Sequence, residues 1–357
     1  MRFNKVSGVI AAVGMWCSSF AVSAAPGLDV SLGAVSGKRA GDGVIHYSLT
    51  NRSDVDVLVL SWETPLRGVE DDLFEVSLDG QPVRYVGREY KRGMPQPEDY
   101  IELKAGQTLS ADVDLSAHYE MRSAANYAVQ FVGHFHDRFA VKPAKAGVDE
   151  KLLPIADADL RSPILSLWVN GIDLPSPGES SGVFNIEKAG SVSFVGCSNT
   201  QANGASSGHA AAQSMADDAR AYLAAGLKGT RYTTWFGKYS SSIYATLTAN
   251  FAKIDDALDN KPIEFYCDCT SSAYAYVYPT QPYKIHLCNA FWSAGTSGTD
   301  SKGGTIIHET SHFDIVANTD DVAYGQTACK RLAKKPSRAI KNADSHEYFA
   351  ENTPRLN

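Results

Sequence analysis

Apolar residues follow two different patterns in the two halves of the chain. From Leu28 to about Val141 they alternate with polar residues in short runs such as GVIHYSLTN and NYAVQFVGHFH, and turn residues such as Asp79-Gly80 separate these runs. Alternation with a period of two is typical of half-buried strands. Regularly spaced strands without helices predict an antiparallel β-sandwich, immunoglobulin-like in outline. We therefore expect an all-β domain over residues 25–177.

The second half has a helical pattern instead. The segments SSGHAAAQSMADDARAYLAAG (206–226) and SSSIYATLTANFAKIDDALDN (240–260) carry apolar residues at helical spacing, and the strand-like runs IEFYCDC, AYAYVYP and KIHLC follow them. These elements predict an α+β domain over residues 193–357. The stretch VNGIDLPSPGESSGVFNIEKAG (169–190) is rich in Pro, Gly and Ser. It predicts a linker over residues 178–192 that a protease can reach.

The N-terminus predicts export. Arg2 and Lys5 precede an apolar run from Val6 to about Val22, and small residues ending at Ala24 follow it. This order is typical of a secretory signal peptide, over residues 1–24, and the run is short for a membrane anchor. We expect a secreted protein without a membrane partner. The formal charge of −7 argues against nucleic acid as a partner, because phosphate binding needs a basic surface.

Cysteine use fits an exported protein. Apart from Cys17 in the predicted signal peptide, every cysteine lies in the second half, at Cys197, Cys267, Cys269, Cys288 and Cys329. In an oxidising compartment four of these five can form two disulfides, with one cysteine left over. Cys267 and Cys269 lie two apart on an apparent strand, where a bridge between them would be strained, so we expect them to pair with different partners.

Two pairs of histidines could bind a metal. His134 and His136 share a face of the last predicted strand, where such a pair is usually part of the polar surface, and we favour that interpretation. His308 and His312, in HETSH, lie four apart and therefore share one face of a helix. Glu309 is rotated about 100° from His308, so it can take the proton of a water that zinc holds without binding the metal itself. This motif predicts a catalytic zinc site.

A catalytic zinc site needs a third protein ligand. His346 is a candidate by residue type, whereas Asp314 projects to the far side of the helix and is excluded. Spacing leaves two choices open. A following helix can supply Glu347 or Glu351, and a chain reversal after the motif can supply the pair at 320–321, because Asn318-Thr319 suits such a reversal.

The segments HETSHFDIVANTDDVAYGQTACKRLA and NADSHEYFAEN resemble the deuterolysin (aspzincin) family of zinc peptidases, in its peptidyl-Lys metalloendopeptidase branch, over about residues 197–357. The family's second motif, Gly-Thr-x-Asp-x-x-Tyr-Gly, corresponds to NTDDVAYG here, with Asn318 in place of the first Gly. Asn can adopt the same backbone conformation. The resemblance implies that Asp321 is the third zinc ligand and that Tyr324 stabilises the oxygen that becomes negative during peptide hydrolysis. Tyr324 could instead be a buried aromatic residue that orders the turn.

The resemblance also implies a substrate pocket and a disulfide pairing. Asp344 and Glu347 match the two acids that hold a lysine after the scissile bond, although the same spacing forms a helix capping box with Asp344 as N-cap. The implied disulfides are Cys197–Cys267 and Cys269–Cys288, with Cys329 as a buried free thiol.

Together these inferences predict a secreted zinc endopeptidase that is made as a preproprotein, holds one Zn²⁺, and cuts proteins or peptides before lysine. The β-sandwich would be a propeptide that blocks the active site, and the Glu187–Lys188 bond in the linker would be a self-processing site. Two alternatives compete. One is a zinc peptidase with Glu347 or Glu351 on the metal, and the other is an exported binding or adhesion protein whose β-sandwich is the working part.

Overall fold

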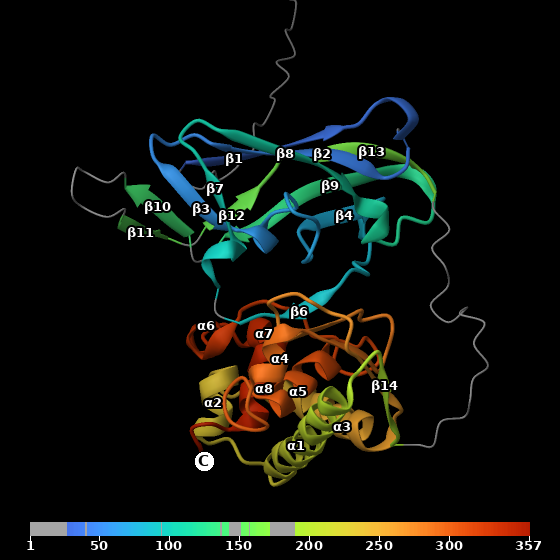
Figure 1. The fold of residues 1–357 in the computed structure, drawn as a ribbon, viewed down its shortest axis with the longest axis vertical. Coiled ribbons are helices and arrows are strands. Elements are labelled where there is room, and N and C mark those ends of the chain that lie inside the picture. Colours follow the sequence, from blue (N-terminus) through green and yellow to red (C-terminus); the bar gives the residue numbers. More distant parts are fainter. Residues whose placement is uncertain are drawn as a thin grey trace, which may run out of the picture.

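The structure is a computed structural model that describes residues 27–39, 41–93, 95–135, 138–142, 151–156, 158–171 and 190–357. The predicted signal peptide, most of the predicted linker and the Glu187–Lys188 bond lie outside these ranges. The chain forms an N-terminal and a C-terminal half, one above the other in Figure 1, and each half has its own hydrophobic core.

The N-terminal half is built from antiparallel sheets, as its alternating pattern predicts. In its described residues the only helical elements are short 3-10 turns. The first sheet has the order β1 (Leu28–Ala34), β2 (Val44–Asn51) and β8 (Thr108–Asp114). The second has the order β11 (Lys151–Ile155), β10 (Arg138–Lys142), β3 (Asp56–Leu60) and β7 (Tyr100–Leu103). The third has the order β12 (Ala158–Arg161), β9 (Ala124–Phe135), β4 (Phe74–Leu78) and β5 (Gln81–Pro82), and β13 (Leu165–Asn170) also pairs with β9. The immunoglobulin-like outline stays a prediction.

The C-terminal half is an α+β arrangement, as expected. Its helices are α1 (Asn199–Ala224), α2 (Thr230–Phe236), α3 (Ser241–Asn260), α4 (Asn289–Ser293), α5 (Lys302–His312), α6 (Gly325–Leu332), α7 (Pro336–Ala339) and α8 (Ala343–Glu351). Its sheet has the order β14 (Val192–Val195), β15 (Ile263–Tyr266), β17 (Lys284–Leu287), β16 (Ala275–Val277) and β6 (Glu89–Lys91). No helix in the described part of the chain is long and apolar enough to cross a membrane.

The HExxH motif lies on α5, a helix buried at every residue from Gly303 to His312. Small residues allow its neighbours to approach closely. A Cβ atom added at Gly303 would lie 3.0 Å from the Cβ of Ala211 on α1, and one added at Gly304 would lie 2.1 Å from a carboxylate oxygen of Glu351 on α8. Because α8 can pack this near, its acidic residues reach the same site as the histidines of α5.

Strand β6 connects the two halves. It belongs to the N-terminal half by sequence, yet it pairs antiparallel with β16 at the edge of the C-terminal sheet, with Tyr90 opposite Tyr276 and Lys91 opposite Ala275. Figure 1 shows this strand lying across the top of the C-terminal half, below the sheets of the N-terminal half. This pairing is not predictable from the sequence, because a three-residue strand in a loop carries no periodic signal.

Both disulfides implied by the family resemblance are present, joining Cys197 to Cys267 and Cys269 to Cys288, and Cys329 is a buried free thiol. The first disulfide ties Cys197, two residues after β14, to Cys267, the residue after β15. The second ties the segment before β16 to Cys288, which is the N-cap of α4. Cys267 and Cys269 thus have different partners, as predicted.

Replacing Cys269 and Cys288 together by alanine should lower the free energy of unfolding by about 2–4 kcal/mol, since the unfolded chain regains the entropy of the open loop. Denaturant unfolding of the full-length protein measures this change. Cys329→Ala is the control, because it leaves both disulfides intact and removes only one sulfur from a core, at a cost of about 1 kcal/mol. Equal losses in the two variants would contradict the prediction.

Candidate active site

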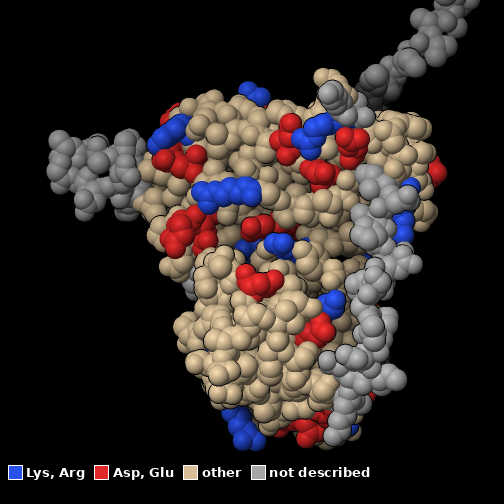
Figure 2. Space-filling view, turned by 45° about the vertical axis from the view of Figure 1, so that its right-hand side comes forward, with Lys and Arg blue, Asp and Glu red and all other residues tan. Residues whose placement is uncertain are grey.

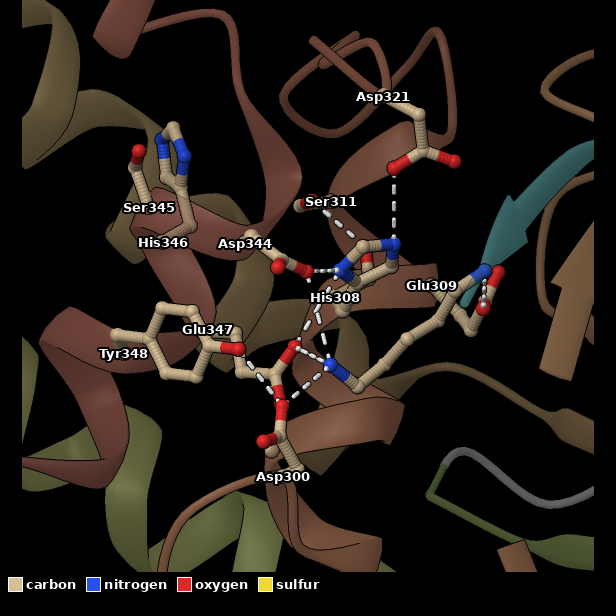
Figure 3. Close-up of polar contacts among 12 residues, drawn as sticks. Asp300, His308, Glu309, Ser311, Asp321, Asp344, Ser345, His346, Glu347 and Tyr348 are labelled. Atoms are coloured by element: carbon tan, nitrogen blue, oxygen red, sulfur yellow. Dashed lines mark hydrogen bonds and ion pairs between the residues drawn. The ribbon is translucent and has the colours of Figure 1, made fainter. Parts of the chain in front are cut away.

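The two histidines of α5 and Asp321 direct ring nitrogens and a carboxylate to one point. Nε2 of His308 lies 3.1 Å and Nε2 of His312 lies 3.6 Å from Oδ1 of Asp321, and all three side chains are almost fully buried. Figure 3 shows Asp321 above His308, on a loop that comes back over the helix. Residues predicted from one helix and one following loop therefore meet in space.

The other ring nitrogen of each histidine is held by a partner. Nδ1 of His308 lies 2.9 Å from a carboxylate oxygen of Asp344, and Nδ1 of His312 lies 2.8 Å from the carbonyl oxygen of Thr319. A proton on each Nδ1 leaves the lone pair on Nε2, which is the arrangement that a metal-binding histidine needs. Burial lowers the pKa of His312 to about 4, so its ring is neutral.

The loop that carries Asp321 is shaped by Asn318 and fixed by the start of α8. Asn318 has a φ of 49°, the left-handed conformation expected when Asn replaces Gly. The side-chain oxygen of Asn342 accepts hydrogen bonds from the N–H groups of residues 322 and 323, at 3.0 and 2.9 Å. The Gly325 N–H donates to Asp344 at 2.6 Å. The loop is therefore held in place along its whole length.

These three side chains suit a divalent metal. These residues form a candidate metal group, since one donor atom from each of His308, His312 and Asp321 lies within 4.8 Å of the others. Nε2 of His312 is buried without a hydrogen-bond partner, which is costly unless a cation binds it. Two imidazoles and a carboxylate are a donor set that zinc takes in catalytic sites.

Glu309 faces the same space from the next position on α5. Burial raises the pKa of its carboxyl group to about 8. One of its oxygens accepts a hydrogen bond from the backbone N–H of Lys91, at 3.2 Å, and the other is buried without a partner. A buried carboxylate with a raised pKa is suited to general-base chemistry near neutral pH.

The side chain of Lys91 enters a buried pocket beside His308. Its Nζ atom lies 2.7 Å from Glu347, 3.1 Å from Asp300 and 3.5 Å from Asp344, and Figure 3 shows these acids converging. Burial alone would lower the pKa of Lys91, but Asp344 and then Glu347 raise it well above its usual value. The pocket thus holds a charged ammonium group.

Asp344 and Glu347 are almost completely buried, which excludes the surface capping box. The N-cap of α8 is Asn342, so Asp344 lies within the first turn and its side chain is free to point inward. Sequence reasoning missed Asp300, which has a φ of 52° and accepts a hydrogen bond from the Tyr348 hydroxyl at 2.7 Å. It lies in a loop before α5, where no spacing rule links it to α8.

The remaining candidates lie elsewhere. His346 contacts the side chain of Asn250 and the carbonyl of Asn342, away from the metal group. Glu351 accepts hydrogen bonds from the N–H and hydroxyl of Ser301, each at 2.8 Å, and so caps α5. Asp314 forms an ion pair with Arg84 of the N-terminal half.

The last candidates from the sequence are the histidine pair His134 and His136 and the side chain of Tyr324. His134 pairs with Asp159 at 2.5 Å on the surface of the N-terminal half, as the polar-surface interpretation predicts, while His136 lies outside the described residues. Tyr324 lies at the start of α6, where burial raises its pKa well above the usual value and the carboxylate of Asp321 adds to the shift.

Strand β6 lies along the site as an extended peptide. The Tyr90 N–H donates to Oδ2 of Asp321 at 3.0 Å, and the Tyr274 N–H donates to the Lys91 carbonyl at 2.9 Å. Figure 2 shows charged side chains mainly on the N-terminal half and along the junction, while the visible face of the C-terminal half is mostly uncharged. The ammonium of Lys91 is hidden within this junction.

An HExxH helix, an acidic residue in the position of a third ligand and a peptide strand beside them are typical of the class of zinc metallopeptidases. The sequence profile of the family described as lysine-specific metallo-endopeptidase, the aspzincins, matches residues 221–351. The chain is 41% identical to an extracellular protease of Aeromonas hydrophila over 93% of its own length and 94% of that protein. It is 34% identical to a peptidyl-Lys metalloendopeptidase of Armillaria mellea, with 94% and 95% covered. A zinc peptidase of Grifola frondosa with a solved structure matches 45% of this chain and all of its own, at 42% identity and a TM-score of 0.44.

The chain therefore belongs to the lysine-specific branch of the aspzincin (deuterolysin) family, as the sequence resemblance predicted, and it is a zinc metalloendopeptidase. Family membership sets aside the alternative of a binding protein without enzymatic activity.

Removing the ammonium of Lys91 should destabilise the full-length protein. Lys91→Met leaves the carboxylates of Asp344 and Glu347 buried without their cation, at a cost of roughly 3 kcal/mol or more. Denaturant unfolding of the full-length protein measures the loss. The control is Lys104→Met, which loses the carboxylate partners Asp56 and Glu102 at an exposed position, where little change is expected. Equal effects at the two lysines would contradict a buried pocket.

Proposed function

We propose that this chain is the precursor of a secreted zinc endopeptidase that hydrolyses peptide bonds on the N-terminal side of lysine. The observation that carries the proposal is the side chain of Lys91, which fills a pocket of three acids while its backbone N–H contacts Glu309. The pocket lies directly beside the metal group, so a lysine bound there brings its preceding peptide bond to the catalytic residues. The printed names of peptidyl-Lys relatives support the same specificity.

His308, His312 and Asp321 would hold one zinc ion, which when bound polarises water and the peptide carbonyl. Glu309 would act as the base that takes a proton from the attacking water and then delivers it to the amine that leaves. Its 3.2 Å contact with the Lys91 N–H supports this role, because that nitrogen corresponds to the leaving amine. Tyr324, beside Asp321, would donate its hydroxyl proton to the oxygen that becomes negative.

Asp344 and Glu347 would select lysine at the residue after the cut, the P1′ position. The Lys91 ammonium lowers the pKa of Asp344 well below its usual range, against the effect of burial, so this acid is charged when the pocket is filled. Two buried carboxylates without a cation would repel each other, and a neutral side chain would leave them unpaired. The pocket would therefore discriminate strongly against apolar residues.

The N-terminal half would be a propeptide that inhibits the enzyme until it is removed. Strand β6 occupies the edge of β16 and the lysine pocket at once, so a substrate cannot bind while the strand is in place. The signal peptide over residues 1–24 would direct secretion, and cleavage at Glu187–Lys188 would separate the halves. The name of the Aeromonas hydrophila relative, an extracellular protease, supports export.

Metal analysis distinguishes the ligand sets. Asp321→Ala should lose most of its zinc, whereas Glu347→Ala should keep close to one zinc per chain, because Glu347 contacts the Nδ1 side of His308 and the Lys91 ammonium. Elemental analysis of dialysed full-length protein measures both. Loss of zinc in Glu347→Ala with retention in Asp321→Ala would instead establish the glutamate-ligand alternative.

Self-processing can be tested with Glu309→Gln. This variant keeps the metal ligands but loses the base, and should reduce peptide hydrolysis by roughly a thousandfold or more. In a protease-free host we expect it to remain full length, while the wild type is cut before Lys188, as N-terminal sequencing would show. Identical processing of both proteins would mean that another protease makes the cut.

A further inference from the structure

Side chains of the β6 segment alternate between two faces. Glu89 and Lys91 are buried and lie opposite Val277 and Ala275, two residues of the C-terminal core. Arg88 and Tyr90 point to the opposite face, over the outer surface of β16. This alternation is that of an extended strand. If a substrate lies as β6 does, Tyr90 marks the position of the residue before the cut (P1), and Arg88 marks the position two residues earlier (P3).

Two tyrosines of the C-terminal half receive these side chains. The rings of Tyr90 and Tyr276 have centroids 5.1 Å apart. The guanidinium carbon of Arg88 lies 4.7 Å from the Tyr276 ring centroid and 5.6 Å from that of Tyr278. Nε of Arg88 also donates a hydrogen bond to the Tyr278 hydroxyl at 2.7 Å. The contact thus combines a flat aromatic surface with a polar hydroxyl.

The surface has a rigid support. The ring of His286 stacks beneath Tyr276 at 4.4 Å with an interplanar angle of 7°, and Tyr266 stacks on His286 at 4.6 Å. His286 is fixed in turn by Asp268, at 3.0 Å. These contacts lie entirely within the C-terminal half, so the stack does not depend on β6. It would remain, with its outer face uncovered, once the N-terminal half has left.

We propose that Tyr276 and Tyr278 form an aromatic shelf that binds the P1 and P3 side chains of peptide substrates, favouring an aromatic residue at P1 and arginine at P3. The inference rests on the proposed lysine-directed hydrolysis and adds a second element of specificity to it. A planar guanidinium over tyrosine gains cation–π attraction, and arginine also satisfies the Tyr278 hydroxyl. Aromatic rings at P1 gain stacking area on Tyr276.

The test uses the full chain, expressed with zinc and assayed once its activity has reached a plateau. The peptides share Lys at P1′ and Ala at P2, and carry Arg-Ala-Tyr, Ala-Ala-Tyr or Arg-Ala-Ala before the lysine. We expect kcat/KM to fall about fivefold or more when Ala replaces Arg at P3 or Tyr at P1. Tyr278→Phe should reduce the Arg-to-Ala ratio at P3 at least twofold, and Tyr276→Leu should abolish both preferences. Tyr239→Phe, at an exposed tyrosine whose ring contacts Tyr232 and Tyr244, is the control and should keep both ratios.

Cleavage before lysine with kcat/KM values within twofold for all three peptides would overturn the shelf and leave the proposed function intact. An equal loss on every peptide in Tyr276→Leu, with unchanged ratios in Tyr278→Phe, would likewise overturn it, since the tyrosines would then be only structural. Failure to cut any of the peptides would reject the proposed function itself.

Discussion

A lysine ammonium buried among three carboxylates links the two halves of this protein. Removing an ammonium group and carboxylates from water is costly, and only close pairing compensates for it. At Lys91 the pairing is close, with Nζ 2.7 Å from Glu347 and 3.1 Å from Asp300. The same requirement shapes the proposed enzyme, because a pocket built around buried acids needs a cation. Lysine's compact charge on a flexible stem can reach it.

Asp344 couples the pocket to the metal group. One of its oxygens contacts Nδ1 of His308 at 2.9 Å and lies 3.5 Å from the Lys91 ammonium, and the other accepts the Gly325 N–H. A single side chain thus orients a proposed zinc ligand, helps to hold the loop after Asp321, and contacts the substrate-like lysine. Replacing Asp344 is therefore expected to affect metal binding and lysine selection together, whereas replacing Glu347 is expected to affect mainly lysine selection.

Local sequence signals predicted the parts of the site that lie on one helix or one short motif. His308, Glu309 and His312 followed from helical spacing alone, and the left-handed conformation of Asn318 followed from its residue type. Residues alone left the third ligand open between Asp321 and the glutamates of α8, and family resemblance favoured Asp321. Spatial proximity without sequence proximity was not predictable. Asp300 reaches the pocket from a loop, and Lys91 of β6 reaches Asp300 and Glu309 from the other half of the chain, through contacts that span about 200 residues.

Helix packing explains why the structure differs from two interpretations of the sequence, the capping box at Asp344 and the metal ligand at Glu351. A capping box at Asp344 assumed a helix starting two residues later than it does, and the tight approach of α8 to Gly304 turns these acids inward. Glu351 was a plausible ligand by type, but it caps α5. In both cases helix packing decided the role of the residue.

Sequencing of the peptides released from a denatured protein mixture by the zinc-loaded, processed enzyme measures directly which residue the pocket of Asp344 and Glu347 selects. We expect lysine to follow the cut at nearly every site, with arginine strongly disfavoured because Asp344 and Glu347 pair with a compact ammonium rather than with a larger, planar guanidinium. Cuts spread over many residue types, or placed equally before arginine and lysine, would contradict it.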